Sequence, residues 1–168
     1  MTDTKTQILS HKQVEQKVNR IAHELYENHF EEKDIIMVGI ASRGLLLAKR
    51  IKKVLQRISP IKVKLLEIKI NKGNPLNNLP ELALTEKDSK GKTVILVDDV
   101  MNSGRTLIYG AKPLLNLPIK ALKTVVLVNR RHRQFPIRAD FVGITLSTTI
   151  QEHISVELGN GTDAVYLT

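Results

Sequence analysis

The spacing of hydrophobic residues predicts three amphipathic helices. In residues 13–30, apolar side chains recur every three or four positions between charged ones, and Ser10 is a suitable N-cap. Residues 45–58 show the same spacing. A third helix is predicted from the turn at residues 103–104 to about residue 115.

Short apolar runs between these helices predict buried strands. Such runs lie at residues 34–40, 93–97 and 121–128, and shorter strands are predicted at 141–144 and 164–167. Residues 63–70 alternate between apolar and polar positions enough to predict a further strand. Residues 71–90 contain prolines, asparagines and a glycine, which predict a long loop. Loops of this length inside a compact domain are usually functional or mobile.

The order of these elements predicts the fold class. Helices and strands alternate, which implies an α/β fold with a mostly parallel central sheet flanked by helices. We find no internal repeat and expect residues 1–168 to form a single domain. In such sheets, ligands bind at the carboxyl ends of the strands.

Composition narrows the class of protein. The 168 residues are 42% hydrophobic and 26% charged, as in ordinary soluble domains. The absence of cysteine excludes a disulfide framework, a thiol nucleophile and a cysteine-ligated zinc site. The N-terminus is polar, and no apolar run approaches the roughly 18 residues of a membrane span, so we expect a cytoplasmic protein without a membrane partner.

The formal net charge of +9 favours polyanionic partners, either nucleic acid or phosphorylated small molecules. A solvated, lysine-rich surface explains this charge equally well. Aromatic residues make up only 4% of the chain, which argues against a stacking platform for single-stranded nucleic acid.

Residues 94–106 (VILVDDVMNSGRT) carry the strongest chemical signal. A buried strand leads to two adjacent carboxylates, Asp98 and Asp99, which can accept hydrogen bonds from a pair of vicinal hydroxyls. A polar loop then opens a helix, whose free N–H groups and dipole favour phosphate. Within that loop, Gly104 permits a close approach of the backbone. A phosphate site beside a diol site matches a ribose 5-phosphate.

Simpler explanations account for only parts of this segment. An acidic pair after a strand is often an N-cap and turn, but the series of strand, acidic pair, polar loop and helix is more specific. The segment lacks the Gly-Lys-Ser/Thr of a P-loop and the G-x-G-x-x-G of a dinucleotide site.

A second candidate loop, Ala41-Ser-Arg-Gly44, follows the first long predicted strand and precedes a helix. Arg43 can pair with two phosphate oxygens in a fork geometry, and Gly44 frees the backbone. Such a turn is usually structural, but its place after this strand favours phosphate binding.

Residues 94–106 resemble the signature of type I phosphoribosyltransferases that binds 5-phosphoribosyl-1-pyrophosphate (PRPP). The resemblance implies the fold of that family, with Asp98 and Asp99 holding the ribose 2′- and 3′-hydroxyls. The implied loop around the 5′-phosphate consists of Asn102, Ser103, Gly104, Arg105 and Thr106. The implied pyrophosphate loop consists of Ser42, Arg43 and Gly44. Catalysis would rest on Arg43 and the acidic pair.

Three further segments resemble the PyrR family of pyrimidine operon attenuators, which are also uracil phosphoribosyltransferases. These segments are 20–24 (RIAHE), 39–51 (GIASRGLLLAKRI) and 129–143 (NRRHRQFPIRADFVG). The resemblance implies transfer of the phosphoribosyl group of PRPP to uracil, giving UMP and pyrophosphate, with Mg²⁺ carried in by PRPP.

The same resemblance implies a small hood, contributed by about residues 129–168 and the N-terminal segment. The residues implied in base recognition are Val128, Asn129, Arg130 and Arg131. The residues implied in binding an RNA hairpin are Arg20, His23, His132, Arg133 and Arg138. A homodimer or higher homo-oligomer is also implied.

The chain departs from the PyrR pattern at several positions. Asn129 stands where relatives usually have Asp, Arg131 where they usually have Gly, and Asn102 where Tyr is common. Residues 71–84 lack the Tyr-Arg-Asp-Asp stretch that closes over PRPP, and Lys72 is the charged residue near the start of this loop.

Two main hypotheses therefore stay open. The first is a uracil phosphoribosyltransferase. The second is a nucleotide-sensing, RNA-binding regulator of pyrimidine genes with weak or lost transferase activity. A purine-type transferase is a third, weaker alternative.

Overall fold

The computed structural model describes residues 4–76, 80–159 and 161–168. In chain order the elements are β1 Thr6–Leu9, α1 His11–His29, β2 Asp34–Ile40, α2 Arg43–Ile58, β3 Lys62–Ile68, α3 Glu86–Ser89, β4 Thr93–Met101, α4 Arg105–Leu115, β5 Ala121–Asn129, β6 Phe141–Thr145, β7 Ile154–Glu157 and β8 Ala164–Leu167.

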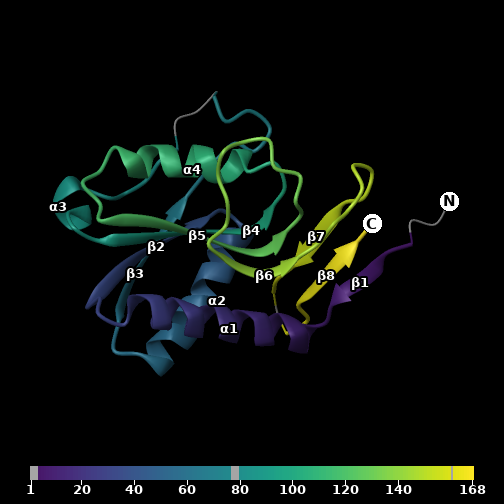
Figure 1. Ribbon diagram of the computed structural model, residues 1–168, viewed down its shortest axis with the longest axis horizontal. Helices are drawn as coiled ribbons and strands as arrows, with labels where there is room; N and C mark the ends of the chain where they lie inside the picture. Colours follow the sequence, from purple (N-terminus) through teal and green to yellow (C-terminus); the bar gives the residue numbers. More distant parts are fainter. Residues whose placement is uncertain (1–3, 77–79, 160) are drawn as a thin grey trace.

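The centre of the fold is a parallel sheet of five strands in the order β3-β2-β4-β5-β6. Helices α1 and α2 cover one face of this sheet and α4 covers the other (Figure 1). Along β2, Ile35 and Met37 pack with α1 and α2, whereas Ile36 and Val38 pack with α4. Because both of its faces are buried, β2 is a continuous apolar run, whereas the edge strand β3 alternates between exposed and buried residues. The predicted α/β fold with a mostly parallel sheet is confirmed.

Helix α1 shows how local sequence sets an element boundary. The Ser10 side chain accepts a hydrogen bond from the backbone N–H of Gln13, and the Gln13 side chain accepts one from the N–H of Ser10. This reciprocal cap satisfies two N–H groups that the first helical turn leaves free. The predicted N-cap is confirmed, although the helix begins at His11, two residues before the predicted start.

A smaller antiparallel sheet, the hood sheet, has the strand order β1-β8-β7. It brings the two ends of the described chain side by side (Figure 1). The prediction contained β8 but missed β1 and β7. Each missed strand has four residues, too few for a periodic pattern, and β1 pairs with a strand at the other end of the chain.

Strand β4 continues past the predicted boundary at residue 97 and ends at Met101. Asp98 stands opposite Val126 and Met101 opposite Asn129 in the ladder with β5. The acidic pair therefore lies inside a strand, which corrects the prediction that the strand ends before Asp98. Pairing with β5 keeps the backbone extended although the side chains are polar.

The predicted loop at residues 71–90 also contains regular structure. Helix α3 begins after Thr85, whose hydroxyl accepts a hydrogen bond from the N–H of Asp88, and Lys69 forms an isolated bridge with Glu81. Residues 77–79 of this loop lie outside the described part of the chain.

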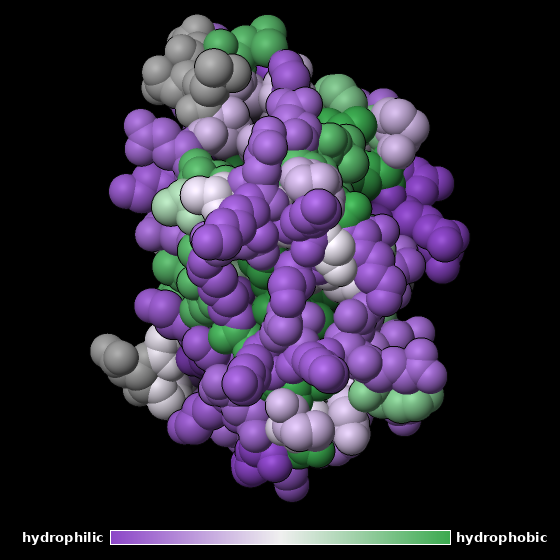
Figure 2. Space-filling view, turned by 90° about the vertical axis from the view of Figure 1, so that its left-hand side faces the viewer, coloured by the Kyte–Doolittle hydropathy of each residue, from purple (hydrophilic) through white to green (hydrophobic). Residues whose placement is uncertain are grey.

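The end of the molecule near α3 is polar. Lys120 pairs with Glu32 at 2.7 Å, Lys64 pairs with Asp88 at 3.5 Å, and similar charged groups surround them. Figure 2 shows this end as a mainly hydrophilic surface with hydrophobic atoms in separate patches. Within the described ranges, no helix is long and apolar enough to cross a membrane.

Candidate functional site

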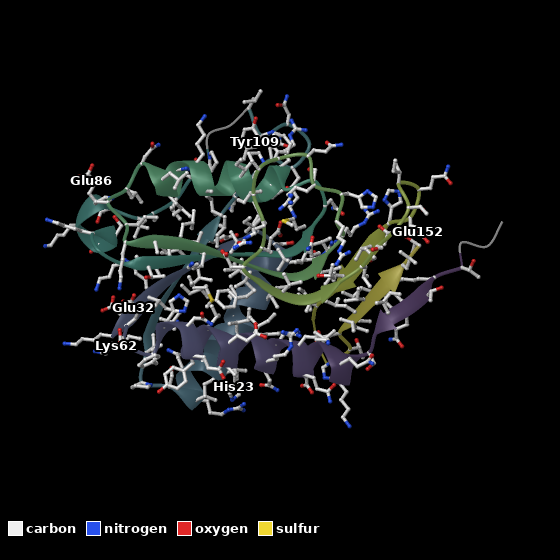
Figure 3. The ribbon with its side chains drawn as sticks, in the orientation of Figure 1. His23, Glu32, Lys62, Glu86, Tyr109 and Glu152 are labelled. Atoms are coloured by element: carbon white, nitrogen blue, oxygen red, sulfur yellow. The ribbon has the colours of Figure 1, made fainter. Side chains whose placement is uncertain are left out.

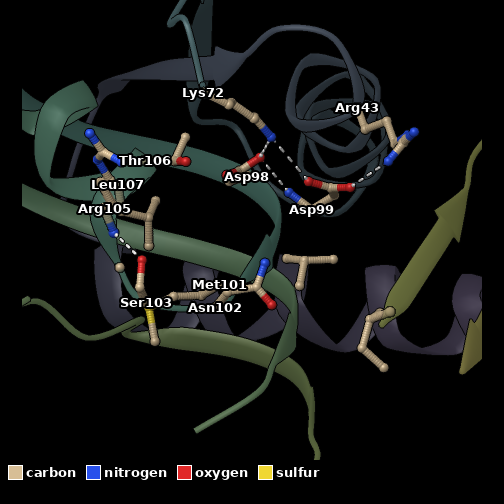
Figure 4. A pocket seen from close by; sticks show the side chains of 13 residues that line it. Arg43, Lys72, Asp98, Asp99, Met101, Asn102, Ser103, Arg105, Thr106 and Leu107 are labelled. Carbon is tan, nitrogen blue, oxygen red and sulfur yellow. Dashed lines mark hydrogen bonds and ion pairs between the residues drawn. The ribbon is translucent and has the colours of Figure 1, made fainter. Parts of the chain in front are cut away.

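A polar cavity of about 390 Å³ opens at the carboxyl end of β4. Its wall consists of residues 98–107 together with Arg43, Lys72 and Ile154 (Figure 4). The start of α2 supplies Arg43, the loop after β3 supplies Lys72, and the hood sheet supplies Ile154. The cavity therefore lies where the open-sheet rule predicts a ligand site.

The acidic pair is the most buried charged feature of this cavity. Asp98 is 1% exposed and Asp99 is 3% exposed. One oxygen of Asp98, Oδ1, accepts a hydrogen bond of 2.9 Å from the N–H of Asp99. The other oxygen, Oδ2, is buried and has no partner among the described residues. A buried polar atom without a partner is costly, so the site is suited to a ligand that brings hydroxyl groups.

Burial and the adjacent Asp99 carboxylate raise the pKa of Asp98 to about 8. Lys72 acts in the opposite direction but does not cancel this effect. In the ligand-free protein at neutral pH, Asp98 therefore holds its proton and can donate as well as accept a hydrogen bond.

Two cations face the acidic pair. The Lys72 ammonium lies 3.5 Å from Asp98 Oδ1 and 3.8 Å from Asp99 Oδ1. The Arg43 guanidinium lies 3.6 Å from Asp99 Oδ2. Lys72 was not among the predicted site residues. Its signal was its position in the loop that follows β3, because the carboxyl ends of parallel strands share one edge of the sheet.

The predicted phosphate loop forms the turn between β4 and α4. Gly104 is the N-cap of α4 and has φ +85°, and a Cβ there would lie 2.8 Å from Ile137 Cγ2. The carbonyl of Ser103 accepts hydrogen bonds from the N–H groups of Gln134 and Phe135, at 2.9 and 3.1 Å. These contacts hold the turn in place, and residues 105–107 at the start of α4 line the cavity. The start of a helix favours an anion.

The predicted pyrophosphate loop adjoins the same cavity. Its peptide bond between Ala41 and Ser42 is cis. A Cβ on Gly44 would lie 2.6 Å from the carbonyl oxygen of Val97, so glycine lets the start of α2 pack directly against β4. Ser42 and Arg43 are exposed and line a neighbouring hollow of about 200 Å³. The two loops predicted to hold phosphates therefore meet at Asp99.

The four residues predicted to recognise the base do not form the wall of the cavity. Val128 is fully buried in β5, and Asn129 is half-buried at its end. Arg130 is buried and makes four side-chain hydrogen bonds within the fold. Arg131 is exposed with φ +48°, a conformation that favours glycine. Their role in base recognition remains a prediction.

The five residues predicted to contact RNA lie in two segments. Arg20 and His23 lie on α1, and His23 lies on the outer side of that helix, across the sheet from Tyr109 of α4 (Figure 3). Arg20 donates to the carbonyls of Val142 and Gly143, at 3.0 and 2.6 Å, so its guanidinium links α1 to β6.

The other three precede β6. Arg133 and Arg138 are exposed, whereas His132 Nε2 lies 2.7 Å from the carbonyl oxygen of Thr148. Contact of all five with RNA stays a prediction.

Two carboxylates at one cavity do not make a complete metal cage. In the described ranges, no three His, Cys, Asp or Glu side chains gather as a metal site. Mg²⁺ typically takes one or two carboxylates and completes its shell with waters and substrate phosphates. The acidic pair beside two phosphate-type loops fits that mode of binding, with Asp99 the more accessible carboxylate.

A buried acidic pair, a glycine-capped helix start and a second basic loop around one cavity form the arrangement expected of a phosphoribosyltransferase. The phosphoribosyl transferase domain family matches residues 4–159, and the chain belongs to that family.

Relatives narrow the class to proteins similar to PyrR. The chain is 35% identical over 166 residues to Bifunctional protein PyrR of Clostridium kluyveri, covering 92% of this chain and 90% of that protein. It is 34% identical over 161 residues to Bifunctional protein PyrR of Haemophilus ducreyi, covering 89% and 87%.

Solved structures support the fold. A hypoxanthine-guanine phosphoribosyltransferase of Bacillus anthracis superimposes with a TM-score of 0.70 at 24% identity, covering 88% of this chain and 85% of that one. A hypoxanthine phosphoribosyltransferase of Trypanosoma cruzi gives a TM-score of 0.74 at 15% identity, covering 95% of both chains.

Proposed function

We propose that the protein transfers the phosphoribosyl group of PRPP to uracil, giving UMP and pyrophosphate. One observation carries this proposal: the buried pair Asp98 and Asp99 shares a cavity with the start of α4 and with Arg43. The similarity to PyrR proteins over most of the chain supports a pyrimidine as the acceptor.

The proposed arrangement of PRPP follows the polarity of the wall. The 5′-phosphate binds the turn at Ser103 and Gly104, where N–H groups and the helix dipole favour an anion. The ribose hydroxyls bind the acidic pair and give the buried Asp98 Oδ2 a partner. The pyrophosphate then lies against Arg43 and Lys72, which line the neighbouring hollow together with Asp99.

In the reaction, a ring nitrogen of uracil forms a bond to C1 of the ribose while the bond from C1 to the pyrophosphate oxygen breaks. The proton of that nitrogen passes to solvent, and the departing pyrophosphate takes the electrons of the broken bond. Arg43 stabilises this developing charge, and the acidic pair holds the sugar in place. When Mg²⁺ is bound with PRPP, it adds positive charge at the leaving group.

Lys72 has a further role in this proposal. Its ammonium lies against Asp98 Oδ1 and Asp99 Oδ1, which the ribose hydroxyls require, so it moves from them when PRPP binds. The side chain is 49% exposed and long enough to turn toward the pyrophosphate. The loop that carries Lys72 thereby links sugar binding to neutralisation of the leaving group.

The test is formation of nucleotide and pyrophosphate from PRPP and Mg²⁺, with uracil, hypoxanthine, guanine, adenine and orotate assayed in parallel. We expect UMP from uracil and its loss in Asp99→Asn. The matched control is Asp88→Asn, an exposed aspartate on α3 at the opposite end of the molecule, which keeps wild-type turnover. Turnover with a purine base alone, or with none of the five, contradicts the proposal.

A second function, regulation through a pyrimidine-gene RNA hairpin, is favoured by the exposed Arg133 and Arg138 and the net charge of +9. The measurement is hairpin affinity with and without UMP. Replacing both arginines by Gln is expected to abolish it, while Lys64→Gln, an exposed residue elsewhere, leaves it unchanged. Equal affinity for an unrelated hairpin contradicts this function.

We further propose a cytoplasmic homo-oligomer. Light scattering on the purified protein measures its mass in solution. A mass of 18.9 kDa, that of one chain, contradicts the proposed oligomer.

A further inference from the structure

The side chain of Arg130 ties the phosphate loop to the hood. Its Nη1 donates to Asn102 Oδ1 at 3.0 Å, and its Nε donates to Thr148 Oγ1 at 2.9 Å. Its Nη2 donates to the carbonyls of Thr149 and Glu152, at 3.1 and 2.6 Å. With 7% of its surface exposed, Arg130 reaches the ligand cavity only through the groups that it holds.

The contact with Arg130 determines how the amide of Asn102 is oriented. A guanidinium has only hydrogen-bond donors, so the amide atom facing it must be the carbonyl oxygen. The amide nitrogen of Asn102 must then point the other way. Figure 4 shows that nitrogen directed toward the acidic pair, and Asn102 is an exposed part of the cavity wall. Within the described residues, no acceptor is found for its two N–H groups.

The position of Asn102 separates it from the rest of the phosphate loop. Ser103 and Gly104 face the start of α4, where the phosphate is expected. Asn102 instead lies on the side that Arg130 fastens to the loop before β7, and β7 supplies the apolar Ile154 to the cavity wall. An apolar side chain and a fixed pair of N–H donors suit a flat base that presents a carbonyl oxygen.

We propose that Asn102 donates a hydrogen bond to a carbonyl oxygen of the base, and that Arg130 is the positioning residue that keeps the amide in this orientation. This inference rests on the proposed function and deepens it. It moves Asn102 from phosphate binding, where the sequence predicts it, to selection of the base.

The experiment compares the affinities of UMP and ribose 5-phosphate by calorimetry, because the two ligands differ by the base. In Asn102→Ala, UMP affinity is expected to fall about tenfold, as for the loss of one hydrogen bond to a base, while ribose 5-phosphate affinity stays within about twofold. Ser103→Ala is the matched control from the same turn, and it is expected to lower the affinities for UMP and ribose 5-phosphate equally.

Arg130 is tested by a double-mutant cycle. Arg130→Met is expected to reduce the affinity ratio of UMP to ribose 5-phosphate in the wild-type background but not in the Asn102→Ala background. If Arg130 had a purely structural role, its replacement would lower the affinities for both ligands in both backgrounds. Thermal unfolding of each variant identifies those that remain folded, and Arg130→Lys serves as a second variant if the Met variant does not fold.

The outcomes separate this inference from the proposed function. Equal loss of UMP and ribose 5-phosphate affinity in Asn102→Ala overturns the inference, even if the wild type makes UMP. So does a wild type that binds UMP no more tightly than ribose 5-phosphate. A wild type that turns over no base, but shows the predicted selective loss, refutes the enzyme and supports the contact.

Discussion

Asp98→Asn is expected to change how the stability of the protein depends on pH. The folded protein holds the Asp98 pKa at about 8, because of burial and the neighbouring Asp99, against an ordinary value of 3.8. Between these two values the folded state binds a proton that the unfolded state has lost. Stability contributed by this group is therefore highest near pH 4 and decreases as pH rises toward 8.

The difference between the two pKa values of Asp98 sets the size of its contribution to the free energy of unfolding. A rise from 3.8 to about 8 corresponds to a ceiling of about 6 kcal/mol in the free energy of unfolding, with a slope of about 1.4 kcal/mol per pH unit. The amide of Asn has almost the same shape and carries no charge at any pH. Relative to the wild type, Asp98→Asn should therefore become more stable as pH rises from 5 to 8, by several kcal/mol.

Urea unfolding at pH 5, 6, 7, 8 and 9 measures this difference. Asp88→Asn again provides the control, because that side chain is 51% exposed and pairs with Lys64 at the surface. Its unfolding free energy should stay parallel to that of the wild type. Parallel curves for Asp98→Asn and the wild type would refute the reasoning, since the buried carboxyl would then titrate as it does in the unfolded chain.

Three other changes give sharp expectations. Arg131→Gly should raise the free energy of unfolding by about 0.5–1 kcal/mol, because φ is +48° at this position; a loss of stability in urea unfolding contradicts this. Gly44→Ala should lower the free energy of unfolding by about 1–3 kcal/mol, since the added Cβ would lie 2.6 Å from a backbone carbonyl of β4. Gly73→Ala, whose nearest contact would be 3.5 Å, is the control, and equal melting temperatures for the two variants count against the packing argument. Lys72→Met should lower the affinity for PRPP about tenfold but leave the affinity for ribose 5-phosphate unchanged, because only PRPP carries the pyrophosphate. If calorimetry shows that the variant and the wild type bind PRPP equally well, Lys72 has no part in the proposed mechanism.

Local sequence was sufficient for most of the central fold. Strands β2, β4 and β5 contain apolar runs, β3 alternates between apolar and charged residues, and the helices that cover them have a periodic apolar face. Each of these elements is therefore specified by residues close to one another in the chain. The same is true of the segment 98–106, which runs from the end of β4 into α4 and whose cavity-lining groups are consecutive. That is why the motif and the parallel sheet could both be predicted.

Contacts between distant residues decided the rest. The hood sheet depends on β1 pairing with β8, and four residues carry too little local signal to predict such a pair. Lys72 reaches the acidic pair because β3 and β4 end at the same edge of the sheet, on either side of β2. Asp98 acquires its raised pKa from burial, which is a property of the packed sheet and not of the Asp-Asp dipeptide.

The sequence by itself therefore determined the class of fold and predicted the residues that would hold a phosphorylated sugar, because periodicity and a consecutive motif are local properties. Only the tertiary structure decided that Arg130 lies behind the cavity wall, and that it fastens Asn102 to the loop before β7. Those atoms belong to segments 28 and 22 positions away from Arg130, and hydrogen bonds between segments so far apart form only when the sheet and the hood pack together.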